Sequence, residues 1–289
     1  MTSMTVPAGR IGFGAMHLSV TSGSAREQAK AVARRAVELG VPLIDTAHLY
    51  GGGANEELLA EALFPYPDGL LVTTKAGVAR TGPDGEWRLD GRPDILREQV
   101  DQALRRLRLD RIELLQLHRV DPEIPLADQI GTLRDLRDAG KINMIGLSEV
   151  TVDQLDQARD IVAIASVQNR YNALDREHEP VLEACERAGI AFLPWRPVAA
   201  GTTGSNAAFA TVAAETGATA TQIALAWLLH RSPVMLPIPG TARIAHLEEN
   251  LAAERVRLTE AQFRLVGGDI AARPDRAWPR GRRRGAPRR

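Results

Sequence analysis

Short apolar runs alternate along this chain with longer segments in which apolar residues recur every three or four positions. The runs are rich in Val, Ile and Leu and lack polar alternation, which is typical of strands buried on both faces. The longer segments have the period of amphipathic helices, and three of them end at a glycine suited to a helix C-terminus, namely Gly40, Gly140 and Gly189. The pattern therefore predicts repeated strand–helix units.

Eight such units follow one another without an internal linker. The expected strands cover residues 10–15, 42–46, 70–75, 112–118, 142–148, 165–171, 191–195 and 234–240. The expected helices cover residues 25–40, 55–63, 94–108, 126–140, 151–162, 179–189, 207–216, 221–230 and 242–253, with a last one beginning at 259. Strict alternation favours a parallel sheet. Eight units in a chain of this length indicate an α/β fold built as a single (β/α)8 TIM barrel, with a doubly wound open sheet as the alternative.

Four polar residues come just after these apolar runs. Asp45 and Tyr50 follow VPLI, Lys75 follows LLVTT, and His118 follows IELLQL. In parallel α/β proteins the carboxyl ends of the strands open onto the active site. A carboxylate, a phenol, an ammonium and an imidazole brought to one rim are the parts of a proton-transfer centre. Any one of them alone would be an ordinary polar residue, but their repeated position indicates a shared site.

Composition places the chain among ordinary globular proteins, with 44% apolar and 25% charged residues in 289. No apolar stretch reaches membrane-spanning length, and the N-terminal sequence lacks the apolar core of a signal peptide. We therefore expect a cytoplasmic protein with no membrane partner. We also expect a monomer or a weak homo-oligomer, although no sequence feature specifies the oligomeric state. The single cysteine, Cys185, lies in a helical segment and is interpreted as a packed residue, not a nucleophile.

The net charge of zero hides an asymmetry between the end of the chain and the rest. Residues 273–289 hold eight arginines and one acid, Asp275, which leaves 28 basic and 35 acidic residues elsewhere. A basic tail could contact nucleic acid, but the acidic remainder offers no continuing basic surface. We therefore expect residues 1–272 to form the barrel and residues 273–289 to be a disordered, Arg-rich tail, with no nucleic-acid partner.

Seven sequence fragments, in this order and spacing, resemble the aldo-keto reductase family. They are GFGAM, LIDTAHLYGGGANEELLAEAL, LVTTK, LLQLH, KINMIGLSEV, SVQNRYN and PIPGTARIAHLEENLAA. The resemblance spans residues 11–265, and the segment HRVDP resembles the bacterial branch that contains pyridoxal reductases and biosynthetic ketone reductases. It implies a (β/α)8 barrel that holds NADPH across the strand ends and catalyses reversible carbonyl reduction.

On the motif positions of that family, the catalytic residues fall on Asp45, Tyr50, Lys75 and His118. Hydride transfer to a carbonyl carbon leaves alkoxide character on the oxygen, so a proton donor is needed within hydrogen-bond reach. A phenol has a pKa of about 10, and an adjacent ammonium lowers it. The resemblance thus implies Tyr50 as the general acid and Lys75 as the group that lowers its pKa. Asp45 would pair with Lys75, and His118 would orient the carbonyl.

Two other functions stay open from the sequence. A lysine at a barrel strand end can form a Schiff base, as in class I aldolases, which would make Lys75 a covalent nucleophile. That interpretation leaves the segments PIPGT and GLSE without a role. The second alternative is a reductase fold kept as a non-catalytic, cofactor-sensing regulatory protein, as in potassium-channel β subunits. The complete set of four residues argues against it.

The resemblance also assigns residues to the binding of NADPH. The full set is Gly14, Ala15, Met16, Asp45, Ser148, Glu149, Gln168, Trp195, Arg196, Pro197, Val198, Gly240, Thr241, Ala242, Arg243, His246, Glu249 and Asn250. Ser148 and Gln168 fall where the family binds the nicotinamide carboxamide, and Trp195 where an aromatic ring stacks on the nicotinamide. Glu149 stands where asparagine is usual. Its carboxylate can accept from the carboxamide NH2 but cannot donate, or it turns to solvent or to an arginine, and the sequence leaves both open.

The segment PIPGTARIAHLEEN would hold the other end of the cofactor. Gly240, Thr241 and Ala242 lie between a strand and a helix start, where backbone N–H groups and the helix dipole bind phosphate. Arg243 is the candidate for the 2′-phosphate, which favours NADPH over NADH, and Arg196 is a candidate for the pyrophosphate. By the same resemblance, the adenine contacts fall on His246, Glu249 and Asn250.

The loops after the strands shape the substrate pocket, where the sequence is least specific. His17, Trp87 and Arg119 are candidates to line it together with His118. An aromatic wall would suit a planar ring, and Arg119 an anionic or phenolic group. The expected substrate is an aldehyde or ketone, with pyridoxal, a natural-product intermediate and a cyclic imine as candidates. No metal site is expected, because the six histidines lack carboxylates or cysteines at ligand spacing.

Overall fold

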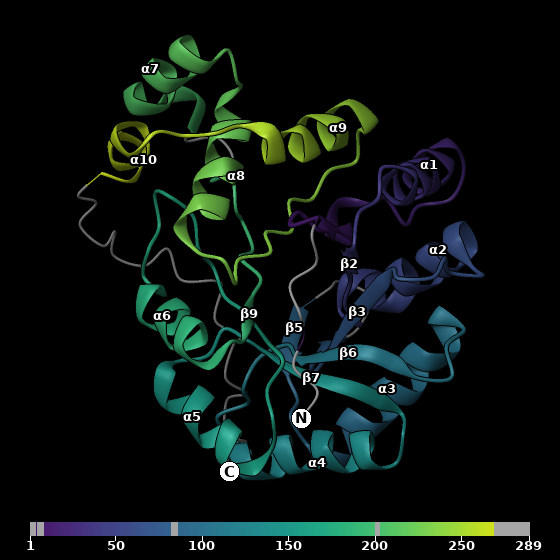
Figure 1. Ribbon diagram of the computed structural model, residues 1–289. Coiled ribbons are helices and arrows are strands. Elements are labelled where there is room, and N and C mark those ends of the chain that lie inside the picture. The colour runs from purple at the N-terminus through teal and green to yellow at the C-terminus, as the bar shows by residue number, and fades with distance from the viewer. Residues whose placement is uncertain (1–3, 5–8, 82–85, 200–202, 269–289) are drawn as a thin grey trace, which may run out of the picture.

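Parallel strands form one curled sheet, and the helices surround its outer side (Figure 1). The computed structural model describes residues 4, 9–81, 86–199 and 203–268, so the expected tail at 273–289 lies outside the described residues. The strands lie in the order β1-β2-β3-β6-β7-β8-β9. Their bounds are β1 Phe13–Gly14, β2 Leu43–Asp45, β3 Leu71–Ala76, β6 Ile112–Leu117, β7 Ile142–Ser148, β8 Ser166–Gln168 and β9 Ala191–Phe192. Each strand pairs in parallel with the next, which requires a crossover connection between them.

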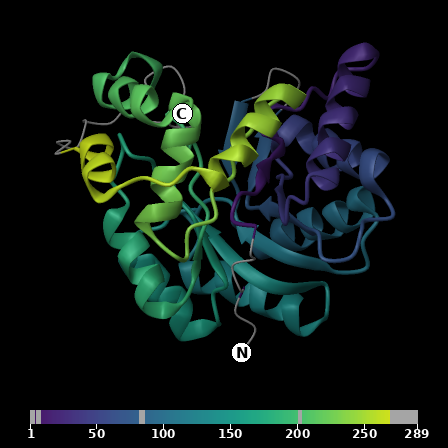
Figure 2. The ribbon, with the colours of Figure 1, turned by 45° about the horizontal axis from the view of Figure 1, so that its top comes forward.

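The helices supply these crossovers and fall where the apolar period predicted them. Their bounds are α1 Ser24–Glu38, α2 Ala54–Leu63, α3 Pro93–Leu107, α4 Leu126–Asp138, α5 Val152–Ile161, α6 Glu179–Ala188, α7 Ala207–Thr216, α8 Ala220–Arg231, α9 Ile244–Ala252 and α10 Glu260–Gly267. Short 3-10 turns occupy Ala15–His17, Tyr50–Gly53, Thr203–Ser205 and Ala253–Arg255. Gly189 caps α6 in the left-handed region with φ of 65°, as predicted for a helix C-terminus. Helix α9 packs against both α8 and α1, so the ring of helices closes on itself (Figure 2).

The eighth predicted strand, residues 234–240, closes the barrel without being a regular strand. At one edge it exchanges backbone hydrogen bonds with Phe192 of β9, at 2.8 Å each. At the other edge Pro237 and Pro239 accept hydrogen bonds of 2.9 and 3.2 Å from the backbone at and beside β1. Proline has no N–H, so these two residues accept from β1 and donate nothing back, which leaves the ladder incomplete. The ring of strands is thereby closed, which confirms the (β/α)8 barrel and excludes the doubly wound open sheet.

An antiparallel hairpin of β4 (Val78–Thr81) and β5 (Glu86–Leu89) stands where the sequence predicts only a loop after β3. Side chains of β5 alternate between exposed and half-buried, so the hairpin has one partly covered face and never forms a buried apolar run. The apolar runs used to find the barrel strands could not reveal it for that reason. The hairpin carries Trp87, one of the candidate substrate residues.

Alternation of side chains between the two faces of each strand stacks a polar layer on an apolar one inside the barrel. Leu43 and Leu114 belong to a buried apolar cluster that also contains Met4 from the N-terminal segment. Two residues further along the same strands, and so on the same face, stand Asp45 and Gln116. The apolar cluster therefore forms a floor beneath the polar strand ends.

Candidate active site

Strand-end side chains form a polar layer at the mouth of the barrel. They are Asp45 of β2, Lys75 of β3, Gln116 of β6, Ser148 of β7 and Gln168 of β8. All five are buried, with no more than 3% of any residue exposed. Polar groups at this depth must satisfy one another, because water does not reach them. Their mutual contacts therefore define the chemistry of the site.

The Lys75 ammonium lies at the centre of this layer. Its Nζ donates to Asp45 Oδ2 at 2.6 Å and to the Thr46 carbonyl at 2.8 Å, and it lies 3.4 Å from the Tyr50 hydroxyl oxygen. Desolvation lowers the pKa of Lys75, but the attraction of Asp45 and of Tyr50 outweighs desolvation, so the pKa is raised. Lys75 is therefore held as a buried cation beside a phenol.

The second oxygen of Asp45 is held by two glutamines. Gln116 Nε2 donates to Asp45 Oδ1 at 3.1 Å, and Gln168 Nε2 donates to the same oxygen at 2.9 Å. Sequence reasoning missed Gln116, although it stands two residues before His118 and so shares the inward face of β6. Gln168 is expected from the sequence at the nicotinamide carboxamide, and in the structure its amide donates to Asp45.

The loop between β2 and α2 returns Tyr50 over Lys75. Gly51 and Gly52 adopt left-handed φ values of 61° and 65°, which glycine reaches without steric cost and which turn the chain tightly after Tyr50. The loop is anchored by Asn55, whose side chain accepts from Thr46 Oγ1 at 2.6 Å and donates to the Ala15 carbonyl at 2.9 Å. The GGG sequence is thus the local reason why a tyrosine outside the strand meets a lysine inside the barrel.

The acidity of Tyr50 reflects two opposing influences. Burial raises the pKa of the phenol above its ordinary value, while the positive charge of Lys75 lowers it, and Arg119 adds a smaller lowering effect. The sequence predicted the effect of Lys75 in the right direction, but burial outweighs it in the structure. Tyr50 therefore keeps its proton at neutral pH, as a general acid must before the reaction.

His118 lies beside Tyr50 as a neutral imidazole. The two rings are edge to face, with centroids 6.1 Å apart. Burial lowers the pKa of His118 well below its ordinary value, and the charges of Lys75 and Arg119 lower it further. In the described part of the chain, its Nδ1 is a buried nitrogen without a hydrogen-bond partner. A buried polar atom of this kind is what a bound molecule would satisfy.

Beyond Asp45, Tyr50, Lys75 and His118, the predicted residues Ser148 and Glu149 are hydrogen-bonded to other protein groups. Arg119 Nη1 donates to Ser148 Oγ at 2.9 Å and to the His118 carbonyl at 2.5 Å. Glu149 Oε1 accepts from Trp195 Nε1 at 2.6 Å. The structure therefore brings Arg119 to the same place as His118 and Ser148, and it directs Glu149 to Trp195.

The predicted phosphate end lies on the other side of the mouth. Gly14 and Gly240 form an isolated parallel bridge, and a Cβ on Gly240 would come within 2.8 Å of Gly14 O and of His17 Nδ1. This close approach explains glycine at position 240 and puts His17 next to that residue. Helix α9 then begins at Ile244 without a side-chain cap from Arg243, and the Arg243 side chain is exposed. An uncapped helix start beside an exposed guanidinium offers donors that can bind a phosphate.

The remaining predicted residues have the following positions. Met16 and Arg196 are exposed, with Arg196 in the left-handed region at φ of 52°. Glu249 accepts a 2.6 Å hydrogen bond from Thr219 Oγ1, which ties α9 to the start of α8. Among the other predicted cofactor and substrate residues, Ala242 and His246 are exposed. The rest are buried or half-buried, and they are Ala15, Pro197, Val198, Thr241, Asn250 and the hairpin residue Trp87.

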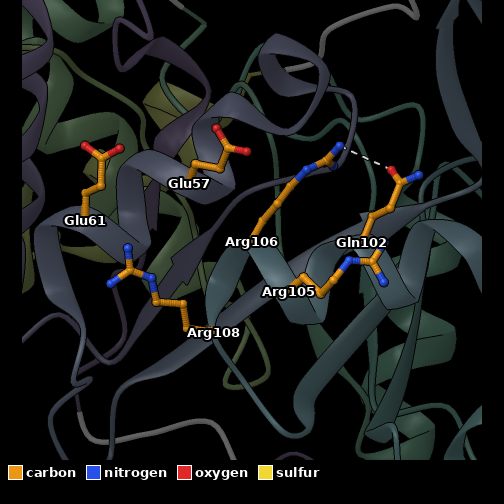
Figure 3. A pocket seen from close by; sticks show the side chains of 6 residues that line it. All are labelled: Glu57, Glu61, Gln102, Arg105, Arg106 and Arg108. Carbon is orange, nitrogen blue, oxygen red and sulfur yellow. Dashed lines mark hydrogen bonds between the residues drawn. The ribbon is translucent and has the colours of Figure 1, made fainter.

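A separate cavity lies between α2 and α3 (Figure 3). Its volume is about 580 Å³, and its lining is Glu57, Glu61, Gln102, Arg105, Arg106 and Arg108. Arg106 of this lining donates to the buried Glu56 at 3.2 Å and lies 3.0 Å from His48 Nδ1. The lining carries no nucleophile and no group of the polar layer, so the strand-end mouth is the stronger candidate site.

Within the described ranges, no three His, Cys, Asp or Glu side chains come together in a way that could hold a metal ion. No described helix combines the length and apolar character needed to cross a membrane. Cys185 is buried in α6, and burial raises the pKa of its thiol to about 12, so it stays a thiol at neutral pH.

Comparison with known proteins gives a consistent picture. The model of the aldo/keto reductase family matches residues 10–268. An uncharacterised oxidoreductase of Schizosaccharomyces pombe is 44% identical over 261 residues, covering 88% of this chain and 84% of that protein. Pyridoxine 4-dehydrogenase of Escherichia coli is 38% identical over 274 residues, covering 91% and 96%. A solved aldo-keto reductase of Klebsiella pneumoniae in complex with NADPH superposes with a TM-score of 0.76 at 26% identity, covering 88% and 89% of the two chains.

Proposed function

Because this chain belongs to the aldo/keto reductase family, we propose that it reduces aldehydes or ketones with NADPH, using Tyr50 as the proton donor. Membership of this family identifies the chain as an oxidoreductase. The observation that carries the proposal is the position of Lys75 Nζ, 2.6 Å from Asp45 Oδ2 and 3.4 Å from the Tyr50 hydroxyl. A buried ammonium fixed against a phenol, in a mouth with a neutral imidazole, is suited to delivering one proton to a carbonyl oxygen.

In the proposed reaction, bound NADPH supplies the hydride to the carbonyl carbon. Tyr50 gives its proton to the carbonyl oxygen, and Lys75 stabilises the phenolate that remains. Asp45 keeps Lys75 charged and in place, and its own orientation is fixed by Gln116 and Gln168. The neutral imidazole of His118 can donate a hydrogen bond that orients the carbonyl oxygen without adding a charge.

The residues at the opposite side of the mouth support NADPH as the cofactor. The N–H groups at the start of α9 and the exposed Arg243 would hold phosphate oxygens. Trp195 and the unpartnered Nδ1 of His118 lie at the strand-end side, where the nicotinamide would be expected. A relative of the same fold has been solved in complex with NADPH, which agrees with this choice.

Pyridoxal is the substrate that we place first among the candidate carbonyls. A relative of 38% identity that covers nearly all of both chains is a pyridoxine 4-dehydrogenase. The Arg119 guanidinium lies close enough to Tyr50 to lower the phenol pKa, so it could also contact a phenolic or anionic group of a substrate near Tyr50. Natural-product ketones and cyclic imines are the other candidate substrates, and they are to be assayed beside pyridoxal.

The same geometry counts against a Schiff-base enzyme. A lysine nucleophile must be a neutral amine, which requires a lowered pKa. Here Asp45 and Tyr50 raise the pKa of Lys75 and three hydrogen bonds occupy its ammonium. Trapping with borohydride in the presence of a keto substrate should therefore yield no adduct at this lysine.

Replacement of Tyr50 by Phe tests the proposed function directly. We expect Tyr50→Phe to lower kcat by about 10²–10⁴-fold, the usual contribution of a general acid, while the Kd for NADPH changes less than about threefold. Turnover is followed by the loss of absorbance of the reduced nicotinamide with aldehydes, ketones, pyridoxal and cyclic imines. The matched control is Tyr66→Phe, which removes a hydroxyl bonded to the Leu107 carbonyl outside the barrel and should leave kcat unchanged. Substantial turnover by Tyr50→Phe would overturn the assignment.

A further inference from the structure

Glu149 joins the ends of three neighbouring strands. It follows β7, its N–H donates to the Gln168 carbonyl at the end of β8 at 3.1 Å, and its Oε1 accepts from the Arg170 N–H at 2.7 Å. The same oxygen accepts from Trp195 Nε1 at 2.6 Å, beyond β9. Glu149 Oε1 therefore accepts two hydrogen bonds from donors of the protein itself.

The backbone at Glu149 is held in an unfavourable conformation. Its φ is 55°, in the left-handed region that side chains other than those of glycine, asparagine and aspartate rarely adopt. Such a conformation persists only where surrounding contacts fix it. The two hydrogen bonds at Oε1 are such contacts, and a side chain one methylene shorter would not extend as far toward Trp195.

The other carboxylate oxygen faces a histidine with a defined tautomer. Asn169 exchanges two hydrogen bonds with the Val150 backbone, at 3.1 and 2.8 Å, which fixes the orientation of its amide. Its NH2 group also lies 3.1 Å from His178 Nδ1, so Nδ1 is the acceptor and Nε2 carries the hydrogen. His178 Nε2 lies 3.8 Å from Glu149 Oε2. Protein groups thus face both oxygens.

From these contacts we propose that Glu149 is a positioning residue that fixes the indole of Trp195, and that it is not a ligand of the nicotinamide carboxamide. The inference rests on the proposed function, because it assumes that NADPH binds at this mouth. Holding Nε1 fixes the plane of the ring, since rotation about either side-chain torsion would carry Nε1 away from the carboxylate. A fixed ring can serve as a stacking surface without losing rotamer entropy when the cofactor binds.

The contact is tested first in the ligand-free chain, where the proposed function plays no part. The indole N–H resonance of Trp195 is assigned by its disappearance in Trp195→Phe. We expect slow hydrogen exchange of this N–H in the wild type and in Glu149→Gln, whose carbonyl oxygen has the same reach. In Glu149→Asn, which tolerates the left-handed backbone but is shorter, exchange should be at least tenfold faster. Equal exchange in all three proteins would overturn the positioning role.

Binding of NADPH then distinguishes positioning from direct contact. Glu149→Asn should raise the Kd about tenfold, and Glu149→Gln less than threefold. In a Trp195→Phe background, Glu149→Asn should add less than a twofold effect, because there is no indole N–H left to fix. If Glu149 instead bound the nicotinamide carboxamide directly, Glu149→Asn would still weaken NADPH binding tenfold in the Trp195→Phe background. Its effect on the Kd would then be smaller for the 3-acetylpyridine analogue of the cofactor, which lacks the amide NH2. If the wild type binds no NADPH, the proposed function fails while the exchange result still stands.

Discussion

Lys75 shows how a full charge is kept inside the barrel at the scale of single residues. An ammonium removed from water is costly unless it is paired and hydrogen-bonded, and here Asp45 and the Thr46 carbonyl supply both. Asp45 in turn is fixed by Gln116 and Gln168. If Tyr50 is the proton donor that we propose, its acidity therefore depends partly on Gln116 and Gln168, which act on it only through Asp45 and Lys75.

Gln116 gives a prediction at this scale. Gln116→Leu removes one donor from the buried Asp45 carboxylate, and we expect a loss of about 1.5–3 kcal/mol in the free energy of unfolding, the usual range for hydrogen bonds to charged groups. We also expect kcat to fall by less than in Tyr50→Phe, because Gln168 and Lys75 still hold Asp45. Urea unfolding and steady-state kinetics measure the two effects.

The control for this variant is Tyr171→Phe, which removes a 2.8 Å hydrogen bond to the Glu179 carboxylate outside the barrel. It should lose comparable stability and keep its kcat. An unchanged kcat in Gln116→Leu would contradict the prediction, because it would show that Gln168 and Lys75 are sufficient to hold Asp45 in place.

At the scale of the elements, the proposed phosphate site lies where the last barrel segment ends and α9 begins. The segment 234–240 closes the barrel with two prolines that accept but do not donate, and it then turns at Gly240 into the start of α9. A regular strand at 234–240 and a side-chain cap on α9 would have occupied the backbone hydrogen-bonding groups of these two segments. The result is a helix N-terminus without a side-chain cap, at the exposed Arg243.

Arg243 gives the prediction at the scale of the element. Arg243→Ala should weaken the Kd for NADPH about 10- to 100-fold, because a charge-assisted hydrogen bond to the 2′-phosphate is worth about 1.5–3 kcal/mol. The Kd for NADH, which lacks that phosphate, should change less than about threefold. Fluorescence titration with each nucleotide measures both values. Arg255→Ala, an exposed arginine just after α9, is the matched control, and equal losses for the two nucleotides in Arg243→Ala would refute the 2′-phosphate role.

The molecule as a whole places neutral histidines among cations. Burial, together with Arg106, lowers the pKa of His48 to about 4, and burial with Lys75 and Arg119 lowers that of His118. In the unfolded chain a histidine titrates at about 6.5. Between those values the unfolded state binds more protons than the folded state, so the stability present above pH 6.5 is lost as the pH falls toward 4.

This linkage predicts an acid-sensitive fold. We expect the free energy of unfolding to fall on the order of 2 kcal/mol between pH 7 and pH 4.5 through His48 alone. His48→Gln, which keeps an acceptor for Arg106, should reduce the slope of stability against pH in that window. His230→Gln at the end of α8 serves as the control. A slope that is the same with and without His48 would contradict the prediction.

The sequence alone revealed those features that depend on local periodicity and on strand ends. Apolar runs and helical periods predicted the parallel strands, the helices and the barrel, because burial on both faces leaves a continuous apolar signal. The same pattern put Asp45, Tyr50, Lys75 and His118 at one rim. It could not reveal the β4–β5 hairpin, whose half-exposed face carries no such signal, or the incomplete pairing at Pro237 and Pro239.

Only the tertiary structure decided which polar groups satisfy each other. Gln116 meets Asp45 across 71 positions of sequence, and Glu149 meets Trp195 across 46. Burial, and not Lys75, sets the direction of the Tyr50 pKa shift. The physical reason is common to all three. Desolvation and hydrogen bonding depend on where distant segments pack, whereas periodicity and strand ends are properties of the local chain.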